Sequence, residues 1–235
     1  MVNSKIQIET WSDIVCPFCF VGKKNLDNVI QELGIQDQVE IIPRSFQLEP
    51  QFPKNTFEPS IKYLSAHKGY PEASVKAMCN DLTIQGQAMG ITFDFDSAKM
   101  FNTHDAHRLV KWARTFALDN ALNHALMQAY TCEGSDMSQT ANLIAIAAKI
   151  GLDENKAKAV LTSSQYATSI EEDRALGLSL GLRGVPFYSI NERHIIAGVQ
   201  TKEEIKKVLK IALSDQEAYL SSPKASSCSI DGDCT

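Results

Sequence analysis

Two cysteines near the start of the chain stand at a spacing that suits reversible redox chemistry. Cys16 and Cys19 enclose only Pro17 and Phe18 in the stretch DIVCPFCFVG. Two intervening residues at the start of a helix place the cysteine Cα atoms about one helical turn apart, within the roughly 4.4–6.8 Å that a disulfide requires. The pair can therefore cycle between dithiol and disulfide without refolding of the chain.

The position of Cys16 predicts that it is the nucleophile. The unpaired N–H groups and the positive dipole end of a helix favour a thiolate at its first residues, where the pKa of a thiol in such a motif can fall to roughly 3.5–7.5. Cys19, one turn further, is then the resolving thiol, which releases the substrate from Cys16. Pro17 suits the first helical turn, and Phe18 offers an apolar contact to a docking polypeptide.

The elements that must position these cysteines follow from hydrophobic periodicity. Residues 6–10 alternate between apolar and polar and predict a strand that leads toward the cysteines. Apolar residues between 26 and 33 fall at i, i+3, i+4 and i+7, which predicts an amphipathic helix ended by Gly34. A second strand at 39–48 completes a β-α-β unit whose strands are expected to run parallel.

The rest of the chain reads as helices followed by a hairpin. Residues 57–162 carry helical signals with no convincing strand, and one helical face is expected to contain Ala106, Leu109, Val110, Ala113 and Ala117. A helix ending near Gly181 precedes two β-rich runs, GVPFYSI and HIIAGV, around the turn-like NER. Thr201 and Glu204 fit the capping box of a closing helix.

This element order is that of an α/β thioredoxin-like fold with a large all-helical domain inserted between its β-α-β and β-β-α halves. The expected domains are the first half of the core at 1–50, the helical insertion at 51–165, the second half at 166–213 and a polar, cysteine-containing tail at 214–235.

Three separated motifs resemble the DsbA-like thiol–disulfide oxidoreductases, and within them the FrnE-like group. They are SDIVCPFCFVG at the start, NTHDAHRL at 102–109 and GLRGVPFY near the end. The resemblance implies that the Val185–Pro186 bond is cis and faces the dithiol, and that the backbone of Val185 pairs with an extended substrate segment. From the residues alone, Pro186 equally suits a trans proline at the first residue of a strand, which is the commoner form.

The expected reaction is thiol–disulfide exchange with protein thiols and disulfides, without a cofactor. Its direction follows from redox potentials, which the sequence does not set, so oxidase, reductase and isomerase roles stay open. Glutathione is a further candidate partner. A glutathione-dependent transferase or isomerase on the same fold is one alternative, although the enzymes of that kind that this chain resembles have serine at the nucleophile's position. A zinc-stabilised binding module is another, although Cys79 and Cys132 stand alone and complete no ligand set.

Several residues allow two interpretations. Asp13 could assist proton transfer to or from the dithiol, but an acidic residue before a helix is more often a cap or a solvated turn residue, and we favour that role. The resemblance suggests that His104 and His107 line the surface near the active-site cleft, and no metal is expected there. Cys228 and Cys234 enclose an Asp-Gly turn signal, so they could close a small disulfide loop or bind a soft metal. The resemblance suggests an accessory dithiol, and the alternative is an unstructured tail.

Composition narrows the partners and the compartment. The 235 residues carry a formal net charge of −5, which argues against a broad phosphate-binding surface and therefore against nucleic acid. The start MVNSKIQIET lacks the pattern of an export signal, and no apolar run approaches the ~20 residues that span a bilayer. We therefore expect a cytoplasmic protein without a membrane partner, where paired cysteines are more often catalytic or metal-binding than structural.

Overall fold

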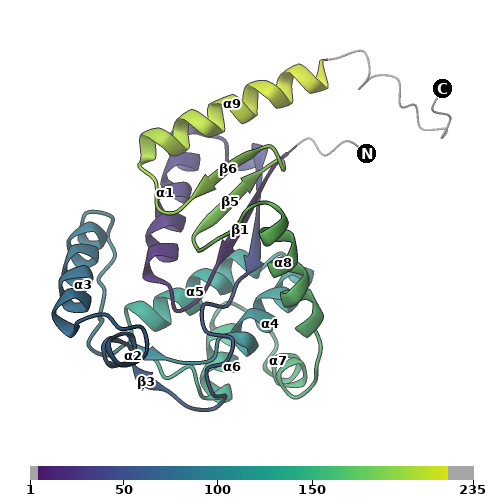
Figure 1. Ribbon diagram of the computed structural model, residues 1–235. Coiled ribbons are helices and arrows are strands. Elements are labelled where there is room, and N and C mark those ends of the chain that lie inside the picture. Colours follow the sequence, from purple (N-terminus) through teal and green to yellow (C-terminus); the bar gives the residue numbers. More distant parts are fainter. Residues whose placement is uncertain (1–4, 222–235) are drawn as a thin grey trace.

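The computed structural model describes residues 5–221, and at its centre lies a four-stranded sheet with the strand order β2-β1-β5-β6 (Figure 1). Strands β1 and β2 run parallel, while β5 is antiparallel to β1 and β6 is antiparallel to β5. The predicted accessory pair, Cys228 and Cys234, lies outside the described residues. The strands are β1 (Ile6–Ser12), β2 (Val39–Ser45), β5 (Phe187–Ile190) and β6 (His194–Ala197).

Helices cover both faces of this sheet. On one face, α1 (Pro17–Leu33) and α9 (Lys202–Leu220) bury their apolar stripes in one cluster with Ile6 and Ile8 of β1. On the other face, α8 (Ala167–Ser179) packs against Trp11, whose indole N–H donates a 2.6 Å hydrogen bond to the Asp173 carbonyl oxygen. The alternation of β1 therefore sends consecutive side chains into two separate cores.

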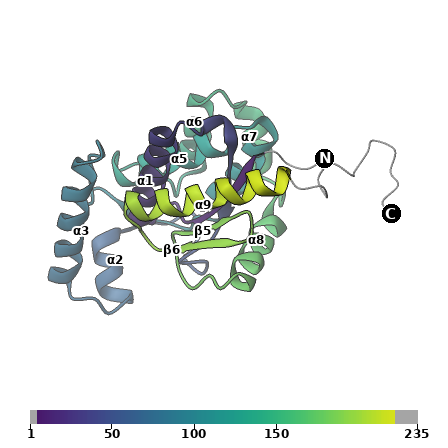
Figure 2. The ribbon, with the colours of Figure 1, turned by 90° about the horizontal axis from the view of Figure 1, so that it is seen from above.

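The segment between β2 and β5 is mainly helical and packs against the cysteine end of α1. One apolar cluster joins Ile14, Cys16 and Phe20 to Leu122 and Met127 of the inserted segment. Figures 1 and 2 both show α2 and α3 as a pair at one side of the molecule, next to α1. The helices are α2 (Ser60–His67), α3 (Glu72–Gln87), α4 (His104–Ala113), α5 (Asp119–Thr131), α6 (Thr140–Lys149) and α7 (Glu154–Leu161).

The predicted fold class is confirmed, because the sheet has the expected β-α-β and β-β-α halves on either side of the helical segment. Gly34 ends α1 in the left-handed conformation, with φ of 66°. The capping box of Thr201 and Glu204 is present at the start of α9. These features depend on local backbone chemistry, which the sequence carries directly.

Two predictions about the extent of elements are wrong, and the closing helix is longer than its apolar stripe indicates. Ala117 does not extend the buried face of α4, because the helix ends at Ala113 and Ala117 is exposed at φ of 56°. Two strands of two residues each, β3 (Glu58–Pro59) and β4 (Lys99–Met100), interrupt the helical segment and are too short to produce a sequence period. The helix α9 continues to Leu220, past residue 214, where the sequence predicts that the polar tail begins.

None of the helices within residues 5–221 is long and apolar enough to cross a membrane.

Candidate active site

The dithiol sits where β1 passes into α1. Cys16 is the N-cap residue of α1, and its carbonyl oxygen accepts a 3.0 Å hydrogen bond from the N–H of Cys19. The Cys16 Sγ lies 3.9 Å from the carbonyl oxygen of Val185, although 169 positions separate the two residues in the chain. The Val185–Pro186 peptide bond is cis. The fold therefore brings the two motifs at opposite ends of the sequence into contact.

Both cysteines of the pair are buried, and Cys19 is the more completely enclosed. Cys16 is 5% exposed and Cys19 is 1% exposed, whereas the intervening Phe18 is 37% exposed. Burial raises the pKa of Cys19 well above its ordinary value, and the adjoining Cys16 raises it further. Cys19 is consequently a neutral thiol near pH 7 in the reduced protein.

Asp13 is fully buried, so the interpretation of this residue as a helix cap or a solvated turn residue is wrong. One carboxylate oxygen lies 3.1 Å from Nε2 of His107, and the other accepts a 2.7 Å hydrogen bond from the N–H of Leu48. The Asp13 carbonyl oxygen accepts a 3.1 Å hydrogen bond from the N–H of Cys16. Asp13 therefore connects the dithiol loop to α4 and to the segment after β2.

His107 was expected at the surface near the cleft, but it is 2% exposed. It lies one turn into α4, with its imidazole directed at Asp13. Nothing in the local sequence distinguishes it from His104, whose side chain is 24% exposed and lies 3.3 Å from Asp105. His107 is buried and His104 is partly exposed because α4 packs against the loop before α1 through the face that carries His107.

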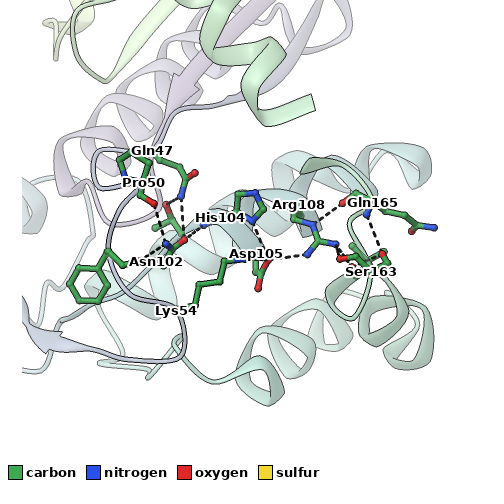
Figure 3. A network of polar contacts seen from close by, with 12 residues as sticks. Gln47, Pro50, Lys54, Asn102, His104, Asp105, Arg108, Ser163 and Gln165 are labelled. Atoms are coloured by element: carbon green, nitrogen blue, oxygen red, sulfur yellow. Dashed lines mark hydrogen bonds and ion pairs between the residues drawn. The ribbon is translucent and has the colours of Figure 1, made fainter. Parts of the chain in front are cut away.

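The other polar residues of the NTHDAHRL motif hold neighbouring segments in place (Figure 3). The amide of Asn102 donates to the carbonyl oxygen of Phe52 at 2.6 Å, and Arg108 donates to the carbonyl oxygen of Gln165 at 2.7 Å. Burial disfavours the charged form of Asp105, but hydrogen bonds from His104 and Arg108 outweigh it and lower the pKa of Asp105 to about 2. The motif thus contributes one residue beside the dithiol and a structural network further away.

An apolar cavity of about 270 Å³ lies beside Cys16, between the start of α1 and the α2–α3 pair. Leu64 of α2 and Val75 and Met78 of α3 help to line it, and none of the described residues in its wall is charged. Its polar groups include the Ser60 and Tyr130 hydroxyls, which bond each other at 2.7 Å. Sequence reasoning missed this cavity because helical stripes do not tell which segments converge on a site.

Gly22 of α1 is a second feature that sequence reasoning missed. A Cβ atom added there would collide with the Tyr188 hydroxyl and would lie 3.2 Å from Cγ of Pro186. Glycine in a helix interior destabilises it by about 1 kcal/mol relative to alanine, so an unexplained helical glycine is a signal of close packing. Here the absent side chain lets the segment with Pro186 and Tyr188 approach α1.

Metal ligands do not gather in the part of the chain that the structure describes. Within residues 5–221, no group of three or more His, Cys, Asp or Glu side chains is arranged to hold a metal ion.

Comparisons with known proteins agree with this geometry. An uncharacterized protein of Bacillus subtilis, YwbO, is 26% identical over 221 residues, which are 90% of this chain and 98% of that protein. A probable DsbA oxidoreductase from Streptomyces coelicolor is 28% identical, with a TM-score of 0.85 over 89% of this chain and 91% of that chain. The cytosolic disulfide reductase DsbM of Pseudomonas aeruginosa has the same fold at 18% identity, with a TM-score of 0.56 over 91% of this chain and 96% of that chain.

The family comparison covers both halves of the sheet, the helical segment and the dithiol. The DSBA-like thioredoxin domain matches residues 7–210. That match includes every site residue described above, from Asp13 to Tyr188. The chain is therefore a member of the DSBA-like thioredoxin domain family.

Proposed function

We propose that the protein is a thiol–disulfide oxidoreductase that acts on protein substrates through Cys16 and Cys19. The observation that carries this proposal is the placement of the Cys16 sulfur at the N-terminus of α1, 3.9 Å from the Val185 carbonyl oxygen. A helix N-terminus favours a thiolate. The neighbouring backbone of Val185 offers an extended substrate segment a strand-like partner.

The proposed reaction has two exchange steps. The Cys16 thiolate attacks one sulfur of a substrate disulfide, which forms a mixed disulfide and releases the other substrate sulfur as a thiolate. Cys19 then attacks the Cys16 sulfur, which forms the Cys16–Cys19 disulfide and releases the second substrate thiolate. Two electrons pass from the dithiol to the substrate, and the reverse sequence oxidises a substrate dithiol.

The surroundings of Cys16 support a polypeptide substrate. Phe18 and Leu48 are 37% and 41% exposed beside the dithiol, and both line the apolar cavity. Glutathione carries two carboxylates and an ammonium group, which the uncharged wall of this cavity cannot pair. We therefore propose that Pro17, Phe18 and Val185 contact substrate, and that Pro186 shapes the loop beside Cys16.

Reduction of insulin by dithiothreitol, followed by turbidity, tests this proposal. The chain should accelerate the reaction, Cys16→Ser should remove the acceleration, and Cys132→Ser, a cysteine that does not line the site, should retain it. Equal activity of the Cys16→Ser chain would contradict the proposal. Equilibration of the dithiol with a glutathione redox buffer then decides between an oxidising and a reducing role.

Three narrower predictions from the sequence stay predictions: membership of the FrnE-like subgroup, the domain boundaries and a cytoplasmic location.

A further inference from the structure

The apolar stripe of α3 faces the cavity beside Cys16. Four residues at i, i+3, i+4 and i+7 of this helix line the cavity, namely Val75, Met78, Cys79 and Leu82. Leu64 of α2 lies in the same wall. Protein interiors are close-packed and contain few voids larger than a water molecule. A cavity of about 270 Å³ against an apolar helix face is therefore suited to an apolar occupant.

The chemistry of the wall disfavours a charged occupant. None of the described residues that line the cavity has a charged side chain. The buried Tyr130 hydroxyl already bonds the Ser60 hydroxyl at 2.7 Å, so it does not need a polar ligand. Burial of a charge without a partner is costly, whereas burial of apolar surface is favourable.

The volume of the cavity suits one large side chain. An apolar cavity of roughly 150 Å³ holds a benzene ring, and pockets for small-molecule ligands typically measure roughly 300–1,000 Å³. At about 270 Å³, this cavity admits a large aliphatic or aromatic side chain and is small for a typical free ligand. Met78 is unbranched, so it adapts readily to the shape of the group that it contacts.

The position of the cavity indicates which chain supplies this side chain. Cys16 belongs to the wall, so a substrate joined to the Cys16 sulfur lies at the cavity. Phe18, Leu48 and Tyr70 are exposed residues of the same wall and offer an apolar path from the dithiol into it. The end of α9, from which the chain continues to residue 235, lies at the opposite end of the molecule from α2 and α3 in Figures 1 and 2. A substrate is therefore the nearer occupant.

Val185 and the cavity contact different parts of such a substrate. The Val185 carbonyl oxygen lies 3.9 Å from the Cys16 sulfur, but Val185 does not line the cavity. A substrate segment that pairs with the backbone of Val185 on one side of its reactive cysteine can therefore direct a neighbouring side chain toward α2 and α3.

We propose that this cavity binds a large aliphatic or aromatic side chain next to the reactive cysteine of the substrate polypeptide. The inference rests on the proposed function and deepens it, because it names the feature by which the chain selects among protein disulfides. Burial of that side chain stabilises the complex in which the Cys16 thiolate attacks. The bond between Cys16 and the substrate sulfur then forms, the substrate disulfide breaks, and its other sulfur leaves as a thiolate. Leu64 and Met78 are specificity-determining residues in this account.

A competition between peptide disulfides tests the proposal. The Cys19→Ser chain, which retains adducts at Cys16, is mixed with equal amounts of two symmetric peptide disulfides. The peptides differ at one position next to the cysteine, which is leucine in one and serine in the other, and separate sets place that position before or after the cysteine. Mass spectrometry reads the ratio of the two Cys16 adducts at early times. The leucine peptide should be captured roughly tenfold more often in at least one set, because its apolar side chain is buried.

Variants of the wall separate the cavity from the exposed residues around it. Met78→Lys places a charge in the wall, so it should remove the preference for leucine and favour a peptide with aspartate at the same position over the serine peptide. Ser74→Trp, at an exposed position of the wall, fills space without a charge and should also remove the preference for leucine. Ile84→Lys changes an exposed residue of α3 outside the wall and should keep the wild-type ratio.

Alkylation of Cys79 gives a readout that does not depend on the rate of capture. Cys79 lies in the cavity wall, whereas Cys132 does not. In the isolated Cys16 adducts, the leucine peptide should slow alkylation of Cys79 severalfold relative to the serine peptide. Alkylation of Cys132 should be the same in both adducts.

The outcomes separate this inference from the proposed function. Equal capture of the leucine and serine peptides in both sets, or a preference for leucine that persists in both wall variants, would overturn the role of the cavity. Equal alkylation of Cys79 in the two adducts would overturn it as well. The absence of a Cys16 adduct with every peptide would instead contradict the proposed function itself.

Discussion

Two buried carboxylates, one beside the dithiol and one on α8, show how this chain separates structure from chemistry. Asp13 beside the dithiol and Asp173 on α8 are 0% and 2% exposed. Asp173 lies 2.9 Å from an Arg44 nitrogen, forms an ion pair with Lys111 and accepts a 2.7 Å hydrogen bond from the N–H of Ser45. Asp13 has one imidazole partner, His107, and one backbone N–H.

The difference lies in the partners. An arginine stays charged under all ordinary conditions, so the pairing of Asp173 with Arg44 and Lys111 holds α8 against β2 permanently. Asp13 contacts the imidazole of His107 and no arginine or lysine, and its charge acts on the thiol of Cys19. The Asp173 region therefore fixes the fold, and the Asp13 region influences the dithiol.

The largest expected effect is the loss of stability when the structural carboxylate, Asp173, is replaced. Asp173→Ala leaves Lys111 without its buried partner and leaves Arg44 with Glu9 alone, and it should lower the free energy of unfolding by roughly 3–5 kcal/mol. Urea denaturation measures the loss, with Glu172→Ala at an exposed neighbouring position as the control. Wherever the variant is folded, its Cys16 should react with a disulfide at the wild-type rate. A stability close to that of Glu172→Ala would contradict the structural role.

Asp13→Asn tests the role of the carboxylate beside the dithiol. The loss of a carboxylate that accepts two hydrogen bonds should lower the free energy of unfolding by roughly 1.5–3 kcal/mol. Because the charge of Asp13 raises the pKa of Cys19, the variant should also lower that pKa. The pH dependence of Cys19 alkylation, measured in the Cys16→Ser chain, reports the change.

Asp173→Asn provides the matched control, since it makes the same carboxyl-to-amide change far from the thiols. It should leave the Cys19 titration where it was. A titration shifted equally by both substitutions, or by neither, would remove the functional distinction between the two carboxylates.

The same two residues mark how far sequence reasoning reaches. The helix stripe, the capping box and the spacing of Cys16 and Cys19 are local patterns, and they predicted the elements correctly. The predicted role of Asp13 as a cap or a solvated turn residue is wrong, because contacts with His107, 94 positions away, and with Leu48 bury its side chain. Local propensity favours a cap for an acidic residue before a helix, and only tertiary packing overrides it. A glycine inside a predicted helix is a local sign of close packing at Gly22, whereas no local sequence pattern predicts that α2 and α3 converge on Cys16.

Substitutions of two helical glycines, one near the dithiol and one on α8, are expected to have the smallest effects on stability. They again compare the dithiol region with the α8 region. A Cβ at Gly22 would meet Tyr188 and Pro186, and a Cβ at Gly177 of α8 would lie 2.7 Å from the Trp11 indole nitrogen. Overpacking at either site, partly offset by the better helix propensity of alanine, should lower the free energy of unfolding by roughly 1–2 kcal/mol. Only Gly22→Ala should slow the reaction of Cys16 with a protein disulfide, because it displaces the segment of Pro186. Equal slowing in Gly177→Ala would contradict this.

Capture of a substrate on the chain tests the central claim most directly. The Cys19→Ser chain is mixed with a disulfide-bonded protein, and the covalent adducts are mapped by mass spectrometry under non-reducing conditions. The account predicts an adduct at Cys16 that dithiothreitol releases, and no adduct with the Cys16→Ser chain. Capture at Cys79 or Cys132 instead, or equal capture by the Cys16→Ser chain, would contradict it.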